Sequence, residues 1–441
     1  MKIPSKYVLN LIFANLFWSF IPIVVTGLFT EISILTIIFL RFLIAGISLF
    51  FTAILIVFIN NSSNKEKKIS IKELILNLRH KNKRFYNIRT YNYYFLIGFF
   101  GIILHIIFYF LALKKTSIPF AMIGTLMTII FVSLYEKGVN YERFDIFRIL
   151  FIIMLSFSII IITFVSLQGA ELKGIPIELP GFIYLLLYSI TASFLYISID
   201  RDSYSKKELE NININKYYKI PRALLKMSIS FISGVIILVP ISFLLTILPI
   251  ETDITQEAIS FFNDITVLFD ILSRWEIIYL IIFATILPYL LIFLAKVNWR
   301  STNLTYSQWS SIIGLIDPIS TLIFSVLLVN EFFPYEYLII VIVFLIITIV
   351  LRYAHEVRNI VHAKILLKIK KGCLNKIPLK ILKFYGVKEI ISLIGEFDLM
   401  LHVKVNSFKD FHYLINRQLK PFDEILDLKV QFVDKIVDKT N

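Results

Sequence analysis

Long apolar stretches are the main feature of the pattern of hydrophobic and polar positions along this chain. Ten of them reach or exceed the roughly 17–25 residues with which a helix crosses a bilayer. They lie near residues 7–27, 33–59, 93–113, 118–140, 145–167, 181–200, 227–249, 277–298, 306–329 and 335–353. The pattern therefore predicts an all-α polytopic membrane protein with ten transmembrane helices.

Basic residues predict the orientation of these spans. Lys2 and Lys6 precede the first stretch, which no small-residue cleavage site follows, so we expect an uncleaved span and not a signal peptide. With the N-terminus in the cytoplasm, the cytoplasmic segments up to residue 305 contain 23 Lys and Arg, and the opposite segments contain four. The positive-inside rule therefore favours a cytoplasmic N-terminus and a cytoplasmic C-terminal segment.

Two of the connecting segments, residues 70–84 and 256–272, carry apolar residues at helical spacing. Ser70 and Glu73 open the first segment with a capping-box pattern. We expect both segments to form helices on the membrane surface, basic on the cytoplasmic side and acidic on the other. Capping the bundle and positioning the loops is the simpler interpretation of both.

The composition changes after Arg352. Residues 361–441 contain 15 Lys and Arg, nine Asp and Glu, and no apolar stretch near 18 residues. The alternation of apolar residues predicts strands at 363–369, 387–394, 399–405 and 425–433 and helices at 374–384 and 407–419. This βαββαβ order is typical of a small ferredoxin-like α+β domain, with Gly395 and Glu396 in the hairpin turn between its central strands.

Composition excludes several classes of protein. Of the 441 residues 58% are hydrophobic and 17% are charged, and the mean hydropathy is +0.80, which excludes a cytosolic enzyme, a secreted protein and a disordered scaffold. The single cysteine, Cys373, excludes a disulfide framework and a Cys-based metal cluster. The net charge of +14 is explained by the cytoplasmic loops, so we expect a lipid bilayer and no nucleic acid as partner.

Ionisable side chains inside predicted spans are the candidate site residues, because a charge in lipid is costly. Arg41, His105 and Asp317 lie deep in the second, third and ninth spans, and Pro318 follows Asp317. Pro22, Pro240 and Pro288 are expected to interrupt other spans, and broken helices beside buried charge indicate a transporter site.

Other roles remain open for these residues. Arg41 and Asp317 are also consistent with one structural ion pair, and His105 with a packing role instead of a proton relay. Trp18, beside Pro22 in a short polar patch, is a candidate cavity residue. The chain has no Ser/His/Asp order, HExxH, Walker loop or paired carboxylates, so we expect no enzyme activity, no cofactor and no metal site.

Ten spans divide into two sets of five, over residues 1–167 and 181–353. Because five is odd, the two halves enter the membrane from opposite sides, which predicts inverted repeats. The segment Leu315-Ile-Asp-Pro-Ile319, with Glu331 after it, resembles the acidic-Pro motif of EamA-type members of the drug/metabolite transporter superfamily.

Further motifs extend this resemblance over residues 5–353. They are Phe17-Trp18-Ser19, Arg41-Phe-Leu-Ile-Ala45 and Ala112-Leu-Lys-Lys-Thr-Ser117, with Glu142 where the first-half Glu of the family belongs. The resemblance implies a transporter of small metabolites. Ile129 and Ser19 depart from the family pattern, where a Pro and a Gly are usual.

The C-terminal segment, residues 361–437, resembles the effector-binding domain of Lrp/AsnC-type regulators through Tyr385–Leu399. That resemblance implies a homodimer formed through the sheets and an amino-acid effector near Gly395, Glu396, Phe397 and Asp398. A tail that only dimerises is the alternative.

The sequence therefore predicts a multi-pass transporter of the plasma or inner membrane. It is expected to move small polar metabolites, amino acids or related compounds first, by alternating access, with residues 361–441 as a cytoplasmic sensing or dimerisation domain. The alternatives are a membrane-anchored sensor whose tail signals without solute flux, and a lipid scramblase.

Overall fold

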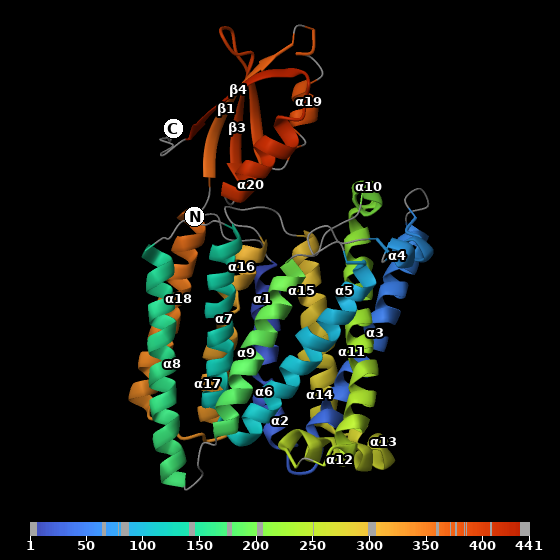
Figure 1. Ribbon diagram of the computed structural model, residues 1–441, viewed down its shortest axis with the longest axis vertical. Coiled ribbons are helices and arrows are strands. Elements are labelled where there is room, and N and C mark those ends of the chain that lie inside the picture. Colours follow the sequence, from blue (N-terminus) through green and yellow to red (C-terminus); the bar gives the residue numbers. More distant parts are fainter. Residues whose placement is uncertain are drawn as a thin grey trace. The chain divides into compact units, whose positions relative to one another are not determined.

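The computed structural model describes residues 7–63, 68–77, 79–80, 88–140, 146–173, 179–200, 206–249, 251–298, 306–358, 361–370, 372–374, 377–382, 384, 386–405 and 408–432. Most of these residues are helical (Figure 1). In the described residues, ten segments are long and apolar enough to cross a membrane: Val8–Thr26, Ile34–Ser62, Thr90–Lys115, Ile118–Tyr135, Ile146–Glu171, Leu179–Ser198, Lys219–Ile247, Trp275–Lys296, Trp309–Leu328 and Tyr335–Glu356. The ten predicted spans are confirmed as helices of this length and polarity.

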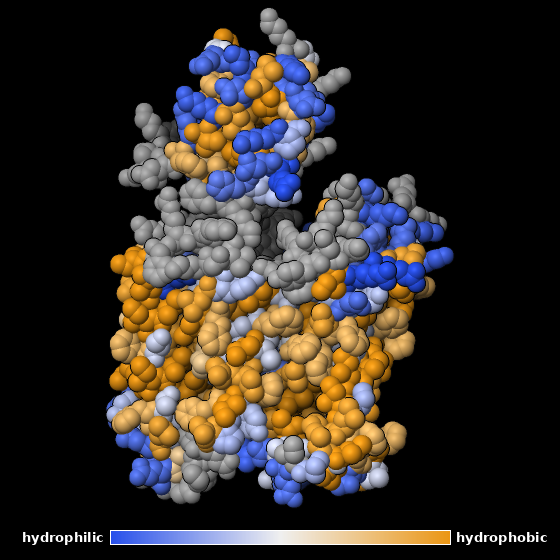
Figure 2. Space-filling model, in the orientation of Figure 1, coloured by the Kyte–Doolittle hydropathy of each residue, from blue (hydrophilic) through white to orange (hydrophobic). Residues whose placement is uncertain are grey.

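The helices of the bundle carry apolar residues on all sides, as expected of helices in lipid. Figure 2 shows an apolar surface around the middle of the bundle, with polar residues gathered at its ends. The spans are built from α1 (Val8–Ser19), α2 (Ile21–Thr26), α3 (Ile34–Ser63), α5 (Thr90–Leu96), η1 (Ile97–Ile103), α6 (Leu104–Lys115), α7 (Ile118–Asn140), α8 (Ile146–Lys173), α9 (Leu179–Asp200), α11 (Lys219–Ile247), α14 (Trp275–Ile281), η4 (Ile282–Ile286), α15 (Leu287–Asn298), α16 (Tyr306–Ile313), α17 (Ile316–Leu328) and α18 (Tyr335–Arg358).

Four of the ten spans are interrupted. The first changes from α1 to α2 at Phe20, two residues before Pro22, and the ninth changes from α16 to α17 just before Asp317. The third and the eighth contain the π-helical segments η1 and η4. Pro288 lies two residues after the end of η4, as expected for an interruption. The interruption predicted at Pro240 is wrong, because α11 runs through this exposed residue without a break.

The third and eighth spans share one plan. Each has an α-helix of seven residues, a π segment and an α-helix of 12 residues. The packing partners match as well: α6 of the third span packs against α9 of the sixth, and α15 of the eighth packs against α1 of the first. The second and seventh spans, α3 and α11, pack against each other.

Helices also form in both connecting segments. In the first, α4 (Ile71–Asn77) ends earlier than the predicted 70–84, and residues 81–84 lie outside the described part. In the second, α12 (Asp253–Asp264), η3 (Ile265–Val267) and α13 (Leu268–Leu272) cover the predicted range. Figure 1 shows α4 and α12 at opposite ends of the bundle.

The loop between α9 and α11 carries two further elements, α10 (Lys206–Ile214) and η2 (Lys216–Tyr218).

The buried side of α12 carries Ala258 and Phe261, whereas Ile259, Ile265 and Phe269 of the predicted apolar stripe are exposed. An exposed apolar stripe on a helix at one end of the bundle is consistent with contact to lipid.

Residues after 360 form one antiparallel sheet of four strands. Its strands are β1 (Val361–Ile369), β2 (Val387–Ser392), β3 (Leu399–Val405) and β4 (Ile425–Phe432), in the spatial order β2-β3-β1-β4. The helical elements α19 (Ile377–Ile381), α20 (Phe408–Tyr413) and η5 (Leu414–Leu419) contribute Ile381, Phe411 and Leu414 to a core with the alternate residues of β1 and β3. The strand alternation predicted from the sequence is confirmed.

Candidate functional site

Arg41 lies in α3 with 3% of its surface exposed, and its guanidinium group contacts the interrupted eighth span. Its Nε donates to Thr285 Oγ1 at 2.7 Å and its Nη2 donates to the carbonyl oxygen of Ala284 at 3.1 Å. Ala284 lies four residues before Pro288, which has no N–H to offer this carbonyl. The interruption of the eighth span therefore supplies the acceptor that holds Arg41.

Trp18 of α1 uses the same acceptor. Its Nε1 donates to the carbonyl oxygen of Ala284 at 3.1 Å, and its ring meets Tyr289 edge-on with centroids 5.9 Å apart. The neighbouring Tyr279 donates its hydroxyl to the carbonyl of Phe17 at 2.9 Å. Trp18, predicted as a cavity residue, is thus placed beside Arg41 by one shared carbonyl.

One guanidinium nitrogen of Arg41, Nη1, is buried and has no hydrogen-bond partner among the described residues. A buried charged donor without a partner is costly, and an anionic group such as a carboxylate or phosphate would satisfy it in bidentate geometry. The site chemistry at Arg41 is therefore that of anion binding.

His105 lies in α6, two residues after the end of η1. Its Nδ1 is 2.6 Å from the carbonyl oxygen of Gly101 and must donate to it, which leaves Nε2 as the acceptor. Its ring stacks on Tyr188 of α9 with centroids 5.8 Å apart, and Tyr188 also pairs with Tyr109 at 4.8 Å. His105 is the second residue of α6, as Pro288 is of α15, so Gly101 and Ala284, each four residues earlier, have equivalent places in the two interruptions.

Asp317 lies in the first turn of α17, half-buried. Its Oδ1 accepts from the hydroxyl of Thr321 at 3.4 Å, and the same hydroxyl is 3.2 Å from the carbonyl oxygen of Ser19, at the interruption of the first span. In the described part of the chain no ion pair joins Asp317 to Arg41. The structural ion pair that the sequence left as an alternative is not formed in this structure.

Tyrosines pack around the candidate residues. Tyr188 contacts the rings of His105 and Tyr109, and Tyr289 contacts the ring of Trp18. Tyr188 and Thr125 of α7 also share a hydrogen bond of 3.2 Å. These tyrosines could not be distinguished in the sequence, because 22 Tyr and 41 Phe are spread along the chain without a characteristic spacing.

The remaining predicted residues have separate positions. Pro318 is buried in the first turn of α17. Glu331 lies beyond the end of α17, and its N–H donates to the carbonyl of Ser325 at 3.2 Å. Glu142 lies outside the described residues. Among the residues with described positions, no three His, Cys, Asp or Glu side chains are arranged to hold a metal ion.

The turn proposed for effector binding in the tail has mainly structural contacts. The Asp398 carboxylate accepts from the N–H of Ile369 at 2.7 Å, and Phe397 is 8% exposed. Gly395 has a φ of 151°, which favours glycine, and with Glu396 it is exposed. Asp398 thus holds the hairpin to the end of β1, and Glu396 faces solvent.

Comparison with known proteins gives a family match for the first part of the chain. The model of the EamA-like transporter family matches residues 5–164. No curated protein matches the chain. A solved structure titled "Crystal structure of protein" is similar over 80% of this chain and 98% of its own length, with 11% identity and a TM-score of 0.45. The family match and the ten candidate spans together imply a multi-pass membrane protein, and the family suggests that it transports small molecules.

Proposed function

We propose that this protein is a secondary transporter of small polar metabolites, with amino acids or related zwitterions as the first class to test. The observation that carries the proposal is the buried Arg41 guanidinium group, which is anchored on Ala284 and Thr285 but keeps Nη1 without a partner among the described residues. A substrate carboxylate at this nitrogen would complete its hydrogen bonds. The carboxyl of Asp317, whose one hydrogen-bond partner among the described residues is Thr321, would bind a substrate amine or exchange a proton.

Alternating access between two inverted repeats is the proposed mechanism. The shared α–π–α plan of the third and eighth spans supports it, as does the matching packing of the third span on the sixth and the eighth on the first. Half-helices that meet near the middle of a membrane expose backbone carbonyls to a site there. Ala284 and Gly101 supply such carbonyls in this chain.

The tail is proposed to have the ferredoxin-like fold and to sense a small effector or to form a homodimer. The strand order β2-β3-β1-β4 and the two helical segments on one face support the fold. An effector that binds one conformation of the tail better than another would bias transport by the difference in its binding free energies, about 1–3 kcal/mol. The proposed location is the plasma or inner membrane, with both the N-terminus and the tail in the cytoplasm.

Flux of radiolabelled amino acids into proteoliposomes tests this function. We expect saturable uptake by the parent protein and none by Asp317→Asn, which preserves the shape of the side chain and its acceptor for Thr321 but removes the charge. Glu336→Gln in the first turn of α18 is the matched control and should transport normally. Normal uptake by Asp317→Asn would refute the assigned site. Binding of solutes without any flux would favour a membrane-anchored sensor, and movement of labelled lipid between leaflets would favour a scramblase.

A further inference from the structure

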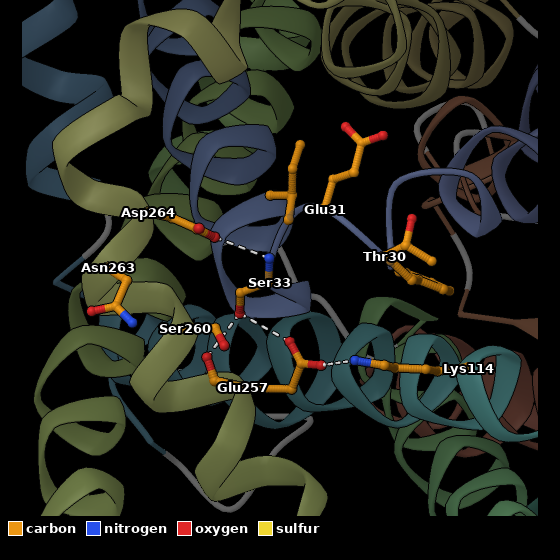
Figure 3. Close-up of a pocket in the computed structure, with 10 residues that line it drawn as sticks. Thr30, Glu31, Ser33, Lys114, Glu257, Ser260, Asn263 and Asp264 are labelled. Atoms are coloured by element: carbon orange, nitrogen blue, oxygen red, sulfur yellow. Dashed lines mark hydrogen bonds and ion pairs between the residues drawn. The ribbon is translucent and has the colours of Figure 1, made fainter.

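A polar cavity of about 330 Å³ lies at the end of the bundle where the α2–α3 loop, the end of α6 and α12 meet (Figure 3). Glu31 and Ser33 line it from the loop, Lys114 from α6, and Glu257 and Asp264 from α12. None of these residues was a candidate from the sequence alone. The side of the membrane on which this cavity lies is the α12 face.

Glu257 joins three elements with one carboxylate. Its Oε1 is 2.6 Å from Nζ of Lys114 at the end of α6, while its Oε2 accepts from the N–H of Ile34 at 2.6 Å and from the hydroxyl of Ser33 at 3.0 Å. The Glu257 side chain is 7% exposed and the Lys114 side chain 41%. This ion pair is therefore enclosed on one side, and water screens it less than a fully exposed pair.

Asp264 adds a second link between α12 and α3. Its Oδ2 accepts from the N–H of Ser33 at 2.9 Å and from the hydroxyl of Thr36 at 2.6 Å. The first N–H groups of a helix have no partners within it, and they form the positive end of its dipole. Two carboxylates of α12 thus cap the N-terminus of α3, which has no acidic residue of its own in its first turn.

The helices linked in this way, α3 and α6, carry Arg41 and His105 of the candidate site (the central site). Arg41 lies seven residues beyond Ile34 in α3, about 10 Å along the helix at 1.5 Å per residue. His105 and Tyr109 precede Lys114 in α6. Glu257 therefore links, on the α12 face, the ends of the two helices that carry Arg41 and His105.

An equivalent contact exists at the opposite end of the bundle. There α4, the helix of the other long connecting segment, contacts the N-terminus of α11 through a hydrogen bond of 2.9 Å between Asn77 Nδ2 and the hydroxyl of Tyr218, the N-cap residue of α11. Ile69 and Leu74 pack with Tyr218 and Leu225 in the same place. Each half thus supplies a loop helix that holds the second span of the other half.

We propose that α12 is a latch for the α12 face, and that the Lys114–Glu257 ion pair must separate before the central site opens to that side. The proposal rests on the transport function proposed above, and it names the contact that controls access to the same site. The neutral contact of Asn77 with Tyr218 has the corresponding position on the other face. The contacts of α12 are stronger than the contact of Asn77 with Tyr218 because they carry charge.

Accessibility of a reporter cysteine tests the latch without any transported solute. The parent for this test carries Cys373→Ser and Thr125→Cys, which places the thiol beside Tyr188. A membrane-impermeant maleimide is applied separately to each face of sided proteoliposomes. We expect Glu257→Gln and Lys114→Met to raise the rate of modification from the α12 face by about threefold or more, with no rise from the other face.

Glu31→Gln is the matched control. It removes an ion pair to Arg274 at the same cavity, but that pair is exposed and joins neither α6 nor α12. We expect its rate to equal that of the parent. Equal rates for Lys114→Met and the parent would overturn the latch. Faster modification from both faces would also overturn it, because a general loosening of the bundle gives that result. If Glu257→Gln does not fold, Lys114→Met decides alone, because Glu257 then keeps its bonds to α3. The modification rates do not depend on solute flux. Failure of the proposed transport function would therefore show in the flux assay and not in this test.

Discussion

Pro288 has no N–H to offer the carbonyl of Ala284, four residues earlier in the eighth span. Arg41 and Trp18 both donate to this oxygen. The proline thus removes one competing donor from the acceptor that holds the buried cation. The position of Arg41 depends on backbone chemistry in another helix, 243 residues away along the chain.

Pro288→Ala is therefore expected to impair the site without unfolding the protein. The new N–H at position 288 would compete with Arg41 for the carbonyl of Ala284 and straighten the span. We expect about tenfold weaker uptake or ligand binding, the effect of losing one charge-assisted hydrogen bond, with an unchanged or higher melting temperature. Proteoliposome flux and thermal unfolding of the purified protein measure the two quantities.

Pro240→Ala provides the matched control for that experiment. Pro240 lies in the continuous helix α11 and is exposed. We expect normal uptake from this variant. Equal losses from both proline variants would show that the effect is general to the bundle and does not pass through Ala284.

The length and polarity of the spans were predictable because lipid imposes a minimum apolar length that few other structures satisfy. Arg41 and Asp317 were identified for the related reason that buried charge is costly. Tyr109, Tyr188 and Tyr289 were not identified, because residues that face lipid and residues that face a packed interior are both apolar or aromatic. Helical periodicity therefore gave no sign of which tyrosines point inward.

Gly98 allows the backbone of the third span to approach the backbone of the seventh closely. A Cβ built at Gly98 would clash with the carbonyl oxygen of Ser230, and one at Gly234 would lie 2.7 Å from the carbonyl oxygen of Gly98. Backbone cannot move aside as a flexible side chain can, so Gly98→Ala should destabilise the bundle by about 1–3 kcal/mol or more. Thermal unfolding in detergent measures the loss. Gly27→Ala, where a Cβ meets nothing within 4 Å, should unfold at the parent temperature; equal stability of the two variants would contradict the close approach.

Asp398 is predicted to stabilise the tail through its bond to Ile369. Asp398→Ala leaves that N–H without its carboxylate acceptor, at an expected cost of about 1–3 kcal/mol to the tail. Hydrogen exchange of the β1 amides in the full-length protein measures this cost. Glu396→Ala, two residues away and exposed, should leave the exchange rates unchanged. Loss of effector binding by Asp398→Ala with parent-like exchange would instead support a direct role in binding.

The strands of the tail were predictable because alternate residues are buried along β1 and β3. Its first helix was predicted at 374–384, and α19 covers Ile377–Ile381 of that range, with residues 375, 376 and 383 outside the described part. Pro378 lies at the second position of α19, where a missing N–H is tolerated. Contacts that join distant segments, such as Asp398 to Ile369 or Glu257 to Ile34, leave no local pattern in a sequence.

His362 gives the tail a dependence on pH. It lies directly opposite Lys404 on β1 and β3, and partial burial, followed by the charge of Lys404, lowers the pKa of His362 below its usual 6.5. The unfolded chain therefore binds the proton more readily than the folded tail, so stability rises with pH and is lost as pH falls through the range below about 6.5. Intrinsic amide exchange slows as pH falls, so we expect β1 exchange in the full-length protein to slow less between pH 7.5 and pH 5.5 than intrinsic chemistry gives, which leaves an excess of exchange at pH 5.5. His362→Gln should reduce that excess, whereas His412→Gln, at an exposed position on α20, should keep it. An excess of the same size in parent and His362→Gln would assign the pH dependence to another group.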